Sequence, residues 1–365
     1  MTLIALTVNQ GYPVLMADIL LTSAYGSGIP LPTFIDGTDE LFSNTQKKPV
    51  ALTQKLYVVN DRLAIALGGR LDQMRTFLNR IQALYMDVNF VNSDLDDFIT
   101  DYPDDESNNL LAIIVRGDLA KDGVFDFYVR TIGDIYLADT DNFDRVFAGG
   151  SGVSSFMKVV TSSSPLRSDI DDTDRFLASN LAAIGYFLSS EILTGKALAN
   201  LWGAGFEMIT VEGGKFRKLK EYTVVVMWCE FGKNIEFNSA PIRTMLFSYD
   251  DETLMVQAIY KDKERTFAIP QINDDRISTN PKLNDPKHET LLIAYLYNDI
   301  DSDGHVYHSI SVFPRNKNTI EGSPIVFSKD GSGSRMTVDK KHDREFFKRS
   351  MEMLRREYPN LRPEL

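Results

Sequence analysis

Residues 1–23 of this 365-residue chain read MTLIALTVNQGYPVLMADILLTS. Two short apolar runs flank a turn that contains Gly11 and Pro13, and this pattern predicts a β-hairpin. A hydroxyl residue, Thr2, opens the hairpin directly after Met1. If Met1 is removed, the chain begins with a threonine that carries its own free amine. This stretch therefore sets the first strands of the fold and holds the most reactive arrangement of groups in the sequence.

Blocks of strands and helices then alternate as far as residue 230. Strands are predicted at residues 55–60, 63–67, 110–115, 125–131, 135–138, 145–148, 206–211, 215–218 and 222–230, and helices at residues 71–85, 94–101, 153–163, 173–189 and 191–202. Residues 24–49, rich in Gly, Pro, Ser and Asp, are predicted to form a long loop. Because hairpins within each strand block favour antiparallel sheets, we predict an α/β fold in which two such sheets lie between helices, a four-layer α-β-β-α sandwich.

Residues 231–365 differ in character, since their strand candidates follow one another with little helix between them. These candidates lie at residues 242–249, 253–260, 266–269, 291–297, 306–313 and 325–327. Residues 346–358 have the apolar spacing of one closing amphipathic helix. We therefore predict two domains, residues 1–234 and a smaller, mainly β C-terminal region at residues 235–365 that ends in a helix.

The amino-acid composition restricts the kinds of partner that the protein is expected to bind and the cellular compartment in which it is expected to occur. The chain carries 51 acidic against 39 basic residues, a net charge of −12. Because such a surface repels phosphate backbones, we expect no nucleic acid partner. One cysteine, Cys229, cannot form an internal disulfide and fits a reducing compartment. The sequence has neither a signal peptide nor an apolar run long enough to span a bilayer. We therefore expect a cytoplasmic protein that does not enter the membrane.

The positions of the histidines restrict the chemistry. The chain has 4 histidines, His288, His305, His308 and His342, so the N-terminal part contains none. A Ser–His–Asp or Cys–His site cannot be assembled within that part alone. A base there must be a lysine, a carboxylate or the α-amine.

Thr2 can supply such an amine once it is the first residue. The α-amine has a pKa close to neutrality, so it can accept the proton of the weakly nucleophilic hydroxyl. An ammonium group such as that of Lys55 would favour the neutral amine and stabilise an alkoxide. Asp18 would hold Lys55 charged and in place. Structural interpretations also stay open, since Asp18 can cap a turn and Lys55 can be an edge-strand charge.

Other stretches fall in a defined order around these residues. Residues 16–23 (MADILLTS) contain the pattern A-D-x-x-x-T-S, and Lys55 directly precedes the hairpin predicted from LYVVNDRLAIALGG. Residues 148–152 read AGGSG, and residues 203–219 (GAGFEMITVEGGKFRKL) form a late hairpin pattern. In order and spacing these stretches resemble the proteasome β-subunit family and its bacterial ATP-dependent peptidase relatives, which are N-terminal-nucleophile (Ntn) hydrolases.

The resemblance, which covers much of the first 225 residues, implies a site and a set of partners. In the implied site Thr2 is the nucleophile, Asp18 the acidic residue and Lys55 the lysine. Ser151 is an accessory serine, Thr22 contacts the substrate backbone, and a backbone N–H near Ala66 is the oxyanion donor. It implies an Ntn-hydrolase-like sandwich, a peptide or protein substrate, a homo-oligomeric ring and a regulatory or unfoldase partner. The implied chemistry needs no metal or organic cofactor.

The chain departs from the family pattern at several positions, and two of them concern the support of the nucleophile. The family has an Asp and a Ser that support the nucleophile just before the late hairpin, where this chain has Ala199 and Trp202. From the resemblance and the chemistry of Thr2 we predict a threonine-type hydrolase that cleaves peptide bonds. Because Ala199 and Trp202 lack the supporting groups, a catalytically inactive assembly or binding subunit is the alternative. A third interpretation is an amidase that acts on a small molecule.

Other motifs have structural explanations. The D-x-D-x-D-G pattern of residues 299–304 resembles the start of a calcium loop, but Ile310 stands where a bidentate Glu is needed, so it predicts a β-turn. His305 and His308 would point to opposite faces of a strand, which disfavours a shared metal. Ser151 can cap a turn or a helix, and its glycine-rich loop lacks the lysine of a phosphate-binding loop.

Overall fold

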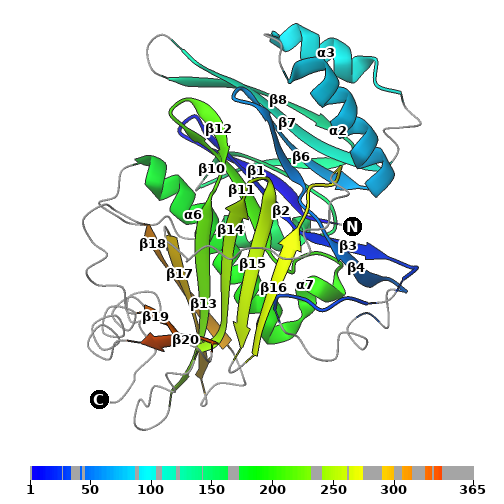
Figure 1. The fold of residues 1–365 in the computed structure, drawn as a ribbon. Helices are drawn as coiled ribbons and strands as arrows, with labels where there is room; N and C mark the ends of the chain where they lie inside the picture. Colours follow the sequence, from blue (N-terminus) through cyan, green and yellow to red (C-terminus); the bar gives the residue numbers. More distant parts are fainter. Residues whose placement is uncertain are drawn as a thin grey trace.

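The computed structural model shows a mixed α/β protein whose sheets are mostly antiparallel (Figure 1). The structure describes residues 2–26, 28–33, 42, 46–86, 90–103, 109–120, 124–141, 143–162, 172–231, 241–260 and 263–273, and the strands at residues 290–299, 306–314, 325–330 and 333–338. The predicted helix at residues 346–358 and residues 300–304 of the predicted β-turn lie outside the described residues.

The predicted N-terminal hairpin forms the centre of the first sheet. Its strands are β12 (Lys215–Lys218), β11 (Phe206–Glu212), β2 (Tyr12–Asp18), β1 (Ile4–Asn9), β10 (Phe143–Gly149) and β9 (Ile135–Thr140), in that order. Gln10 and Gly11 both have positive φ, as a two-residue hairpin turn of this hand requires. The turn sets a register in which Ile4 lies opposite Ala17, so the hairpin prediction is confirmed.

A four-stranded sheet lies next to the first. Its strands are β5 (Leu56–Asn60), β6 (Leu63–Gly69), β7 (Leu110–Leu119) and β8 (Phe125–Ile132), in that order. The helices α2 (Leu71–Tyr85) and α3 (Asn92–Thr100) lie over this sheet (Figure 1). Phe77 and Ile81 of α2 pack with Ile65 and Leu67 in one buried cluster, which confirms the spacing predicted for this helix.

Strand β1 is buried on both faces. Because side chains alternate along a strand, Ile4 and Leu6 point to one face and Leu3 and Ala5 to the other. The first pair packs in a cluster with residues of the four-stranded sheet such as Ile113. The second pair packs in a cluster with residues of the helices α5 (Val153–Ser162), α6 (Asp172–Thr194) and α7 (Lys196–Ala199).

A second six-stranded sheet follows and continues into the C-terminal part of the chain. Its order is β16 (Lys263–Ile269), β15 (Thr253–Tyr260), β14 (Pro241–Asp250), β13 (Glu221–Phe231), β17 (Thr290–Asp299) and β18 (Val306–Pro314). Only β13 and β17 run parallel among these described strands. Because β13 pairs with β14, the predicted domain boundary between residues 234 and 235 falls between two paired strands of this sheet.

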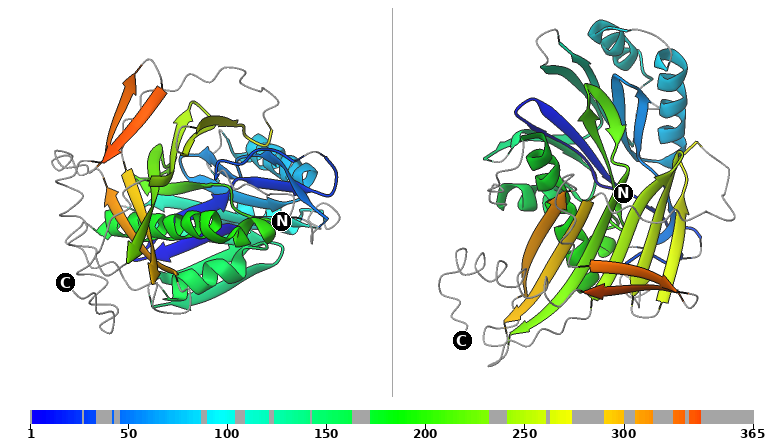
Figure 2. Two further views of the ribbon diagram at one scale, coloured as in Figure 1. Left: turned by 90° about the horizontal axis from the view of Figure 1, so that it is seen from below. Right: turned by 60° about the vertical axis from the view of Figure 1, so that its left-hand side comes forward.

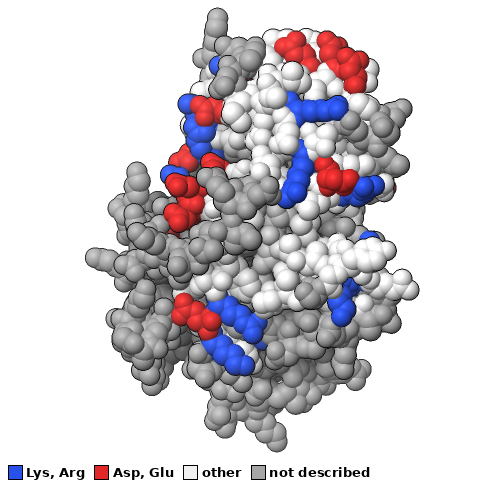
Figure 3. Space-filling model, turned by 45° about the vertical axis from the view of Figure 1, so that its right-hand side comes forward, with Lys and Arg blue, Asp and Glu red and all other residues white. Residues whose placement is uncertain are grey.

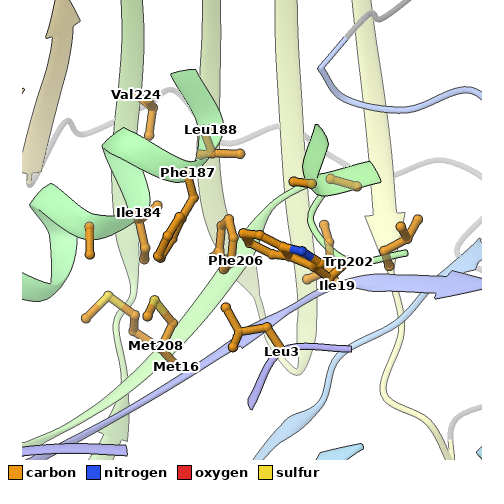
Figure 4. Close-up of a cluster of buried hydrophobic side chains, with 14 of the residues drawn as sticks. Leu3, Met16, Ile19, Ile184, Phe187, Leu188, Trp202, Phe206, Met208 and Val224 are labelled. Atoms are coloured by element: carbon orange, nitrogen blue, oxygen red, sulfur yellow. The ribbon is translucent and has the colours of Figure 1, made fainter. Parts of the chain in front are cut away.

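Helix α6 and the second six-stranded sheet share one core with the first sheet. The helix contacts β2 as well as β17 and β18 (Figure 2). Phe187 of α6, Phe206 of β11 and Val224 of β13 belong to the same buried cluster (Figure 4). The second six-stranded sheet therefore packs onto the elements that carry the N-terminal hairpin.

Two element boundaries differ from the sequence prediction. Residues 24–49 were expected to be loop, but β4 (Lys48–Leu52) pairs with β3 (Leu20–Ser23). Pro49 made a strand unlikely from the sequence, because proline lacks the N–H that a strand donates. The proline is tolerated because it lies at a register shift in a sheet of only two strands. The helix expected at residues 191–202 is the end of α6 followed by α7, because Gly195 adopts a left-handed conformation between them. A last two-stranded sheet joins β19 (Ile325–Asp330) to β20 (Gly333–Val338).

Candidate functional site

Buried charges mark one region of the molecule. Acidic and basic side chains lie close together on the surface shown in Figure 3. Among the described residues, four charged side chains are instead at most 1% exposed: Asp18, Lys55, Glu191 and Glu207. Contacts or shared neighbours link all four, and Thr2, also 1% exposed, lies among them. Burying this many charges is unfavourable unless they are paired and hydrogen-bonded, so this region is the candidate site.

The structure brings together Thr2, Asp18 and Lys55. Thr2 precedes β1, Asp18 ends β2 and Lys55 precedes β5, so all three lie at strand ends. Thr2 Oγ1 donates to Asp18 Oδ1 at 2.6 Å, and Lys55 Nζ donates to Thr2 Oγ1 at 2.7 Å and to Asp18 Oδ1 at 2.7 Å. The predicted proximity of these three residues is thereby confirmed, whereas their catalytic roles stay predictions.

Further hydrogen bonds fix the orientation of this triangle. Lys55 Nζ also donates to Leu20 O at 2.8 Å, which gives each of its three N–H groups an acceptor. Asp18 Oδ1 accepts from Leu3 N at 2.8 Å, and Asp18 Oδ2 accepts from Gly203 N at 3.0 Å. Burial lowers the pKa of Lys55, while the adjacent Asp18 carboxylate opposes that shift. The carboxylate therefore helps to retain a proton on the lysine that contacts the Thr2 hydroxyl.

Glycines allow the backbone to approach Thr2 closely. A Cβ on Gly68 would lie 2.5 Å from Thr2 Cγ2, and one on Gly150 would lie 2.1 Å from Thr2 O. Gly152 N donates to Thr2 O at 3.3 Å, so the loop that contains Ser151 lies against Thr2 as predicted. Ser151 Oγ is buried and has no hydrogen-bond partner among the described residues.

The register of β6 bears on the predicted oxyanion donor. Leu67 N donates to Lys55 O at 2.8 Å, so Leu67 faces the β5 side of the strand. Backbone groups alternate between the two neighbours of a strand, which turns the Ala66 N–H toward β7, where Ile113 is its partner. By the same alternation the Gly69 N–H faces the side of Lys55. The register thus disfavours Ala66 and favours Gly69 as the amide nearest the site.

Thr22 lies on β3, opposite Pro49 of β4. Its hydroxyl oxygen is buried and has no hydrogen-bond partner among the residues that the structure describes. Its predicted contact is with a substrate backbone, which the structure does not contain. The role of Thr22 therefore stays a prediction.

Two buried glutamates were missed by the sequence reasoning. Glu191 of α6 accepts a hydrogen bond from Ala204 N at 2.9 Å, and burial raises its pKa to about 8. Gly203 has a positive φ of 113°, and a Cβ there would lie 2.1 Å from Glu191 Oε2, so position 203 favours glycine. The loop also joins Glu191 to Asp18, since its Gly203 N binds Asp18. The sequence signal that could have identified Glu191 is that it is the single charged residue in the stretch GYFLSSEIL.

Glu207 of β11 supports Lys55 from the backbone side. Its Oε1 accepts hydrogen bonds from Lys55 N and from Leu56 N, the latter at 3.0 Å. Its Oε2 accepts one from Tyr249 OH at 3.0 Å. Burial raises the pKa of Glu207, and the adjacent Lys218 opposes that rise. Glu207 lies among buried apolar residues in the stretch FEMIT, so the sequence shows its charge but not the contacts of its side chain.

The two positions at which the chain lacks the family's supporting residues contribute no polar group to the triangle. Trp202 is 2% exposed and packs edge-on against Phe187 and Phe206 (Figure 4). Its ring also lies against Gly152, where a Cβ would be 3.0 Å from it. Ala199 ends α7. In the described part of the chain, the backbone support for Asp18 comes instead from the N–H groups of Leu3 and Gly203.

Comparisons with known proteins give no family assignment. No protein-family model matches the chain, and no curated protein matches its sequence. The helices in the described residues include none with the length and apolar character needed to cross a membrane. The same residues contain no group of three or more His, Cys, Asp or Glu side chains that could hold a metal ion.

Proposed function

We propose that this protein is a threonine-type N-terminal-nucleophile hydrolase that cleaves amide bonds of peptides. The observation that carries the proposal is the buried contact of Lys55 Nζ with Thr2 Oγ1 and Asp18 Oδ1, each at 2.7 Å. The two adjoining sheets, with α2 and α3 beyond one and α5 and α6 beyond the other, support a four-layer α-β-β-α sandwich as the frame of this site.

In the proposed reaction Met1 has been removed and Thr2 carries a free α-amine. Thr2 Oγ1 attacks the carbonyl carbon of the substrate while the α-amine takes the hydroxyl proton. The C–N bond then breaks and the proton passes to the leaving amine, which leaves the acyl group on Thr2 as an ester. Water, deprotonated by the same amine, hydrolyses the ester. The Lys55 ammonium stabilises the alkoxide, and Asp18 holds that ammonium in place.

The remaining groups receive supporting roles in this proposal. The register of β6 favours the Gly69 N–H over that of Ala66 as the donor that stabilises the oxyanion. Ser151, in a loop against Thr2, is an accessory group, and Thr22 lies on the strand proposed to bind the substrate backbone. This chemistry uses neither a metal nor an organic cofactor.

A catalytically inactive assembly or binding subunit is the second candidate. The buried Trp202, in the region where the resemblance implies a polar supporting residue, favours it. The resemblance also implies a homo-oligomeric ring and a regulatory or unfoldase partner. Native mass spectrometry of the purified protein, alone and with proteins that co-purify, tests both.

The decisive experiment has two steps. Intact mass of the purified protein is expected to show that Met1 is absent, because threonine is a small second residue. Thr2→Ala is then expected to lower turnover of a fluorogenic peptide by on the order of 10⁴-fold or more, because it removes the nucleophile. Thr2→Ser is the matched control, since it keeps a hydroxyl and a small first residue.

Either step can overturn the proposal. Retention of Met1 in every preparation would leave the amine acylated and favour the inactive subunit. Unchanged turnover in Thr2→Ala would assign the activity to another site or another protein. Turnover of a small amide but of no peptide would favour the amidase interpretation.

A further inference from the structure

The backbone around Lys55 is held by the second six-stranded sheet and the residues that follow it. The Gln54 side-chain amide donates to Glu252 O at 2.6 Å and to Ile269 O at 2.8 Å. Gln54 N donates to Pro270 O at 3.1 Å. These acceptors lie at the turn between β14 and β15 and at the end of β16. The residue before Lys55 is thus fixed by a part of the chain about 200 residues away in sequence.

A second line of contacts reaches Lys55 itself. Tyr249, on β14, donates its hydroxyl to Glu207 Oε2 at 3.0 Å. The other oxygen of Glu207 accepts the backbone N–H groups of Lys55 and Leu56. Lys55 Nζ then contacts Thr2 Oγ1 at 2.7 Å. An unbroken series of contacts therefore joins the second six-stranded sheet to the proposed nucleophile.

We propose that Tyr249 is a positioning residue for Lys55 and acts through Glu207, so that the second six-stranded sheet completes the active site. This inference rests on the proposed function for its effect on turnover. The positioning of Lys55 by Tyr249 does not depend on the proposed function.

The need for Tyr249 follows from the position of Glu207. A glutamate has several rotatable bonds, so two backbone contacts at one oxygen leave its other oxygen to be fixed. Lys218 Nζ lies 3.8 Å from Glu207 Oε2 and also donates to Gln54 Oε1. Without the Tyr249 hydroxyl, Lys218 would be the remaining described partner of Glu207 Oε2. Glu207 could then turn toward it and release the Lys55 backbone.

The electrostatic consequence has a definite sign. The titratable groups that act on Glu207 are Lys218 of β12 and Tyr249 of β14, and the Glu207 charge in turn acts on Lys55 and raises the pKa values of the buried Tyr57 and Tyr222. Asp18 faces Lys55 from β2. The Tyr249 hydrogen bond favours the charged form of Glu207, and that charge favours the protonated form of Lys55. Loss of the hydroxyl therefore moves the titration of Lys55 to lower pH.

The test compares Tyr249→Phe with Tyr222→Phe. Tyr222 is a buried tyrosine on the neighbouring strand, and its hydroxyl donates to Phe206 O at 2.6 Å rather than to a carboxylate. Tyr249→Phe is expected to lower kcat by about 10-fold with KM within about twofold, because the nucleophile's partner is misplaced. Tyr222→Phe, with a similar thermal melting point, is expected to keep kcat within about twofold of wild type.

The readout that a purely structural role would not move is the titration of Lys55. In protein labelled with ¹³C at the lysine ε-carbon, the Lys55 signal is identified by its absence in Lys55→Arg. Its titration is expected to shift to lower pH in Tyr249→Phe, further in Glu207→Gln, and not in Tyr222→Phe. Equal titration in all four proteins, wild type included, would overturn the inference. Absence of turnover in the wild type would overturn the proposed function while the titration still decides the role of Tyr249.

Discussion

Two lysine–carboxylate pairs contact the backbone or side chains of residues 54–56, and they differ in the distance between their charged groups. Lys55 Nζ lies 2.7 Å from Asp18 Oδ1, with both side chains at most 1% exposed. Lys218 Nζ lies 3.8 Å from Glu207 Oε2, and the lysine side chain is 14% exposed. Asp18 Oδ1 accepts hydrogen bonds from a hydroxyl and an ammonium, whereas Glu207 accepts them from two backbone N–H groups and a tyrosine hydroxyl.

The difference separates two kinds of buried charge. The carboxylate of the first pair is hydrogen-bonded to the ammonium and to the Thr2 hydroxyl, so under the proposed function the pair would act on the reacting oxygen. The carboxylate of the second pair fixes the chain that carries Lys55, and its lysine is secondary. A buried ion pair is weak evidence for stability, but one that also contacts a buried hydroxyl group makes the region a candidate functional site.

Asp18→Asn is expected to have the largest effect, because it removes the charge from the tighter pair. Turnover is expected to fall on the order of 10³-fold or more, since Lys55 loses the partner that holds its proton. The free energy of unfolding is expected to fall by about 3–5 kcal/mol, because a buried ammonium is left without its counter-charge. Peptide hydrolysis and urea denaturation measure the two effects.

The double variant Asp18→Asn with Lys55→Met is the control for that prediction. Removing both charges is expected to restore much of the stability lost by Asp18→Asn, while turnover stays as low. A double variant as unstable as the single one would mean that Asp18 supports the Gly203 loop more than it supports Lys55.

Glu191 extends the comparison to a carboxylate with no cation partner in the described part of the chain. Burial raises its pKa to about 8, so between about pH 4.5 and pH 8 the folded protein holds a proton that the unfolded chain releases. The stabilisation is complete below the unfolded pKa and is lost as pH rises through that interval. The free energy of unfolding is therefore expected to fall by about 1.4 kcal/mol per pH unit from this group.

The matched variant Glu191→Gln keeps an oxygen acceptor for Ala204 N but cannot titrate. Urea denaturation of both proteins between about pH 5 and pH 7.5 isolates the contribution as the difference between their slopes. Parallel slopes would show that Glu191 titrates close to its ordinary range and is better solvated than its burial suggests.

The sequence predicted the tight pair and not the loose one, for a physical reason. Thr2, Asp18 and Lys55 occupy strand ends, and the hairpin turn at Gly11 sets where the first two lie. Local pattern therefore carries most of the information about them. Glu207 instead depends on Tyr249, which comes from a separate sheet. A contact between residues far apart in sequence leaves no periodic signal.

The same limit explains the errors in detail. The helix predicted at residues 191–202 is interrupted because Gly195 takes a left-handed conformation, which the apolar spacing does not reveal. The position near Ala66 was implied by the resemblance, whereas the direction of its N–H depends on the pairing of β6 with β7. Residue identities thus located the site, and strand register decides which backbone groups face it.

Lys218→Met is expected to have the smallest effect and is the sharpest test of the comparison. Glu207 keeps its contacts with Lys55 N, Leu56 N and Tyr249 OH, so turnover is expected to change by no more than about threefold. Lys55→Met, the same substitution in the tighter pair, is expected to lower turnover about as far as Asp18→Asn does. Peptide hydrolysis by the two variants gives the answer directly. An equal loss in both would mean that the looser pair also acts on the reacting groups, and the distinction drawn from 2.7 Å against 3.8 Å would then be wrong.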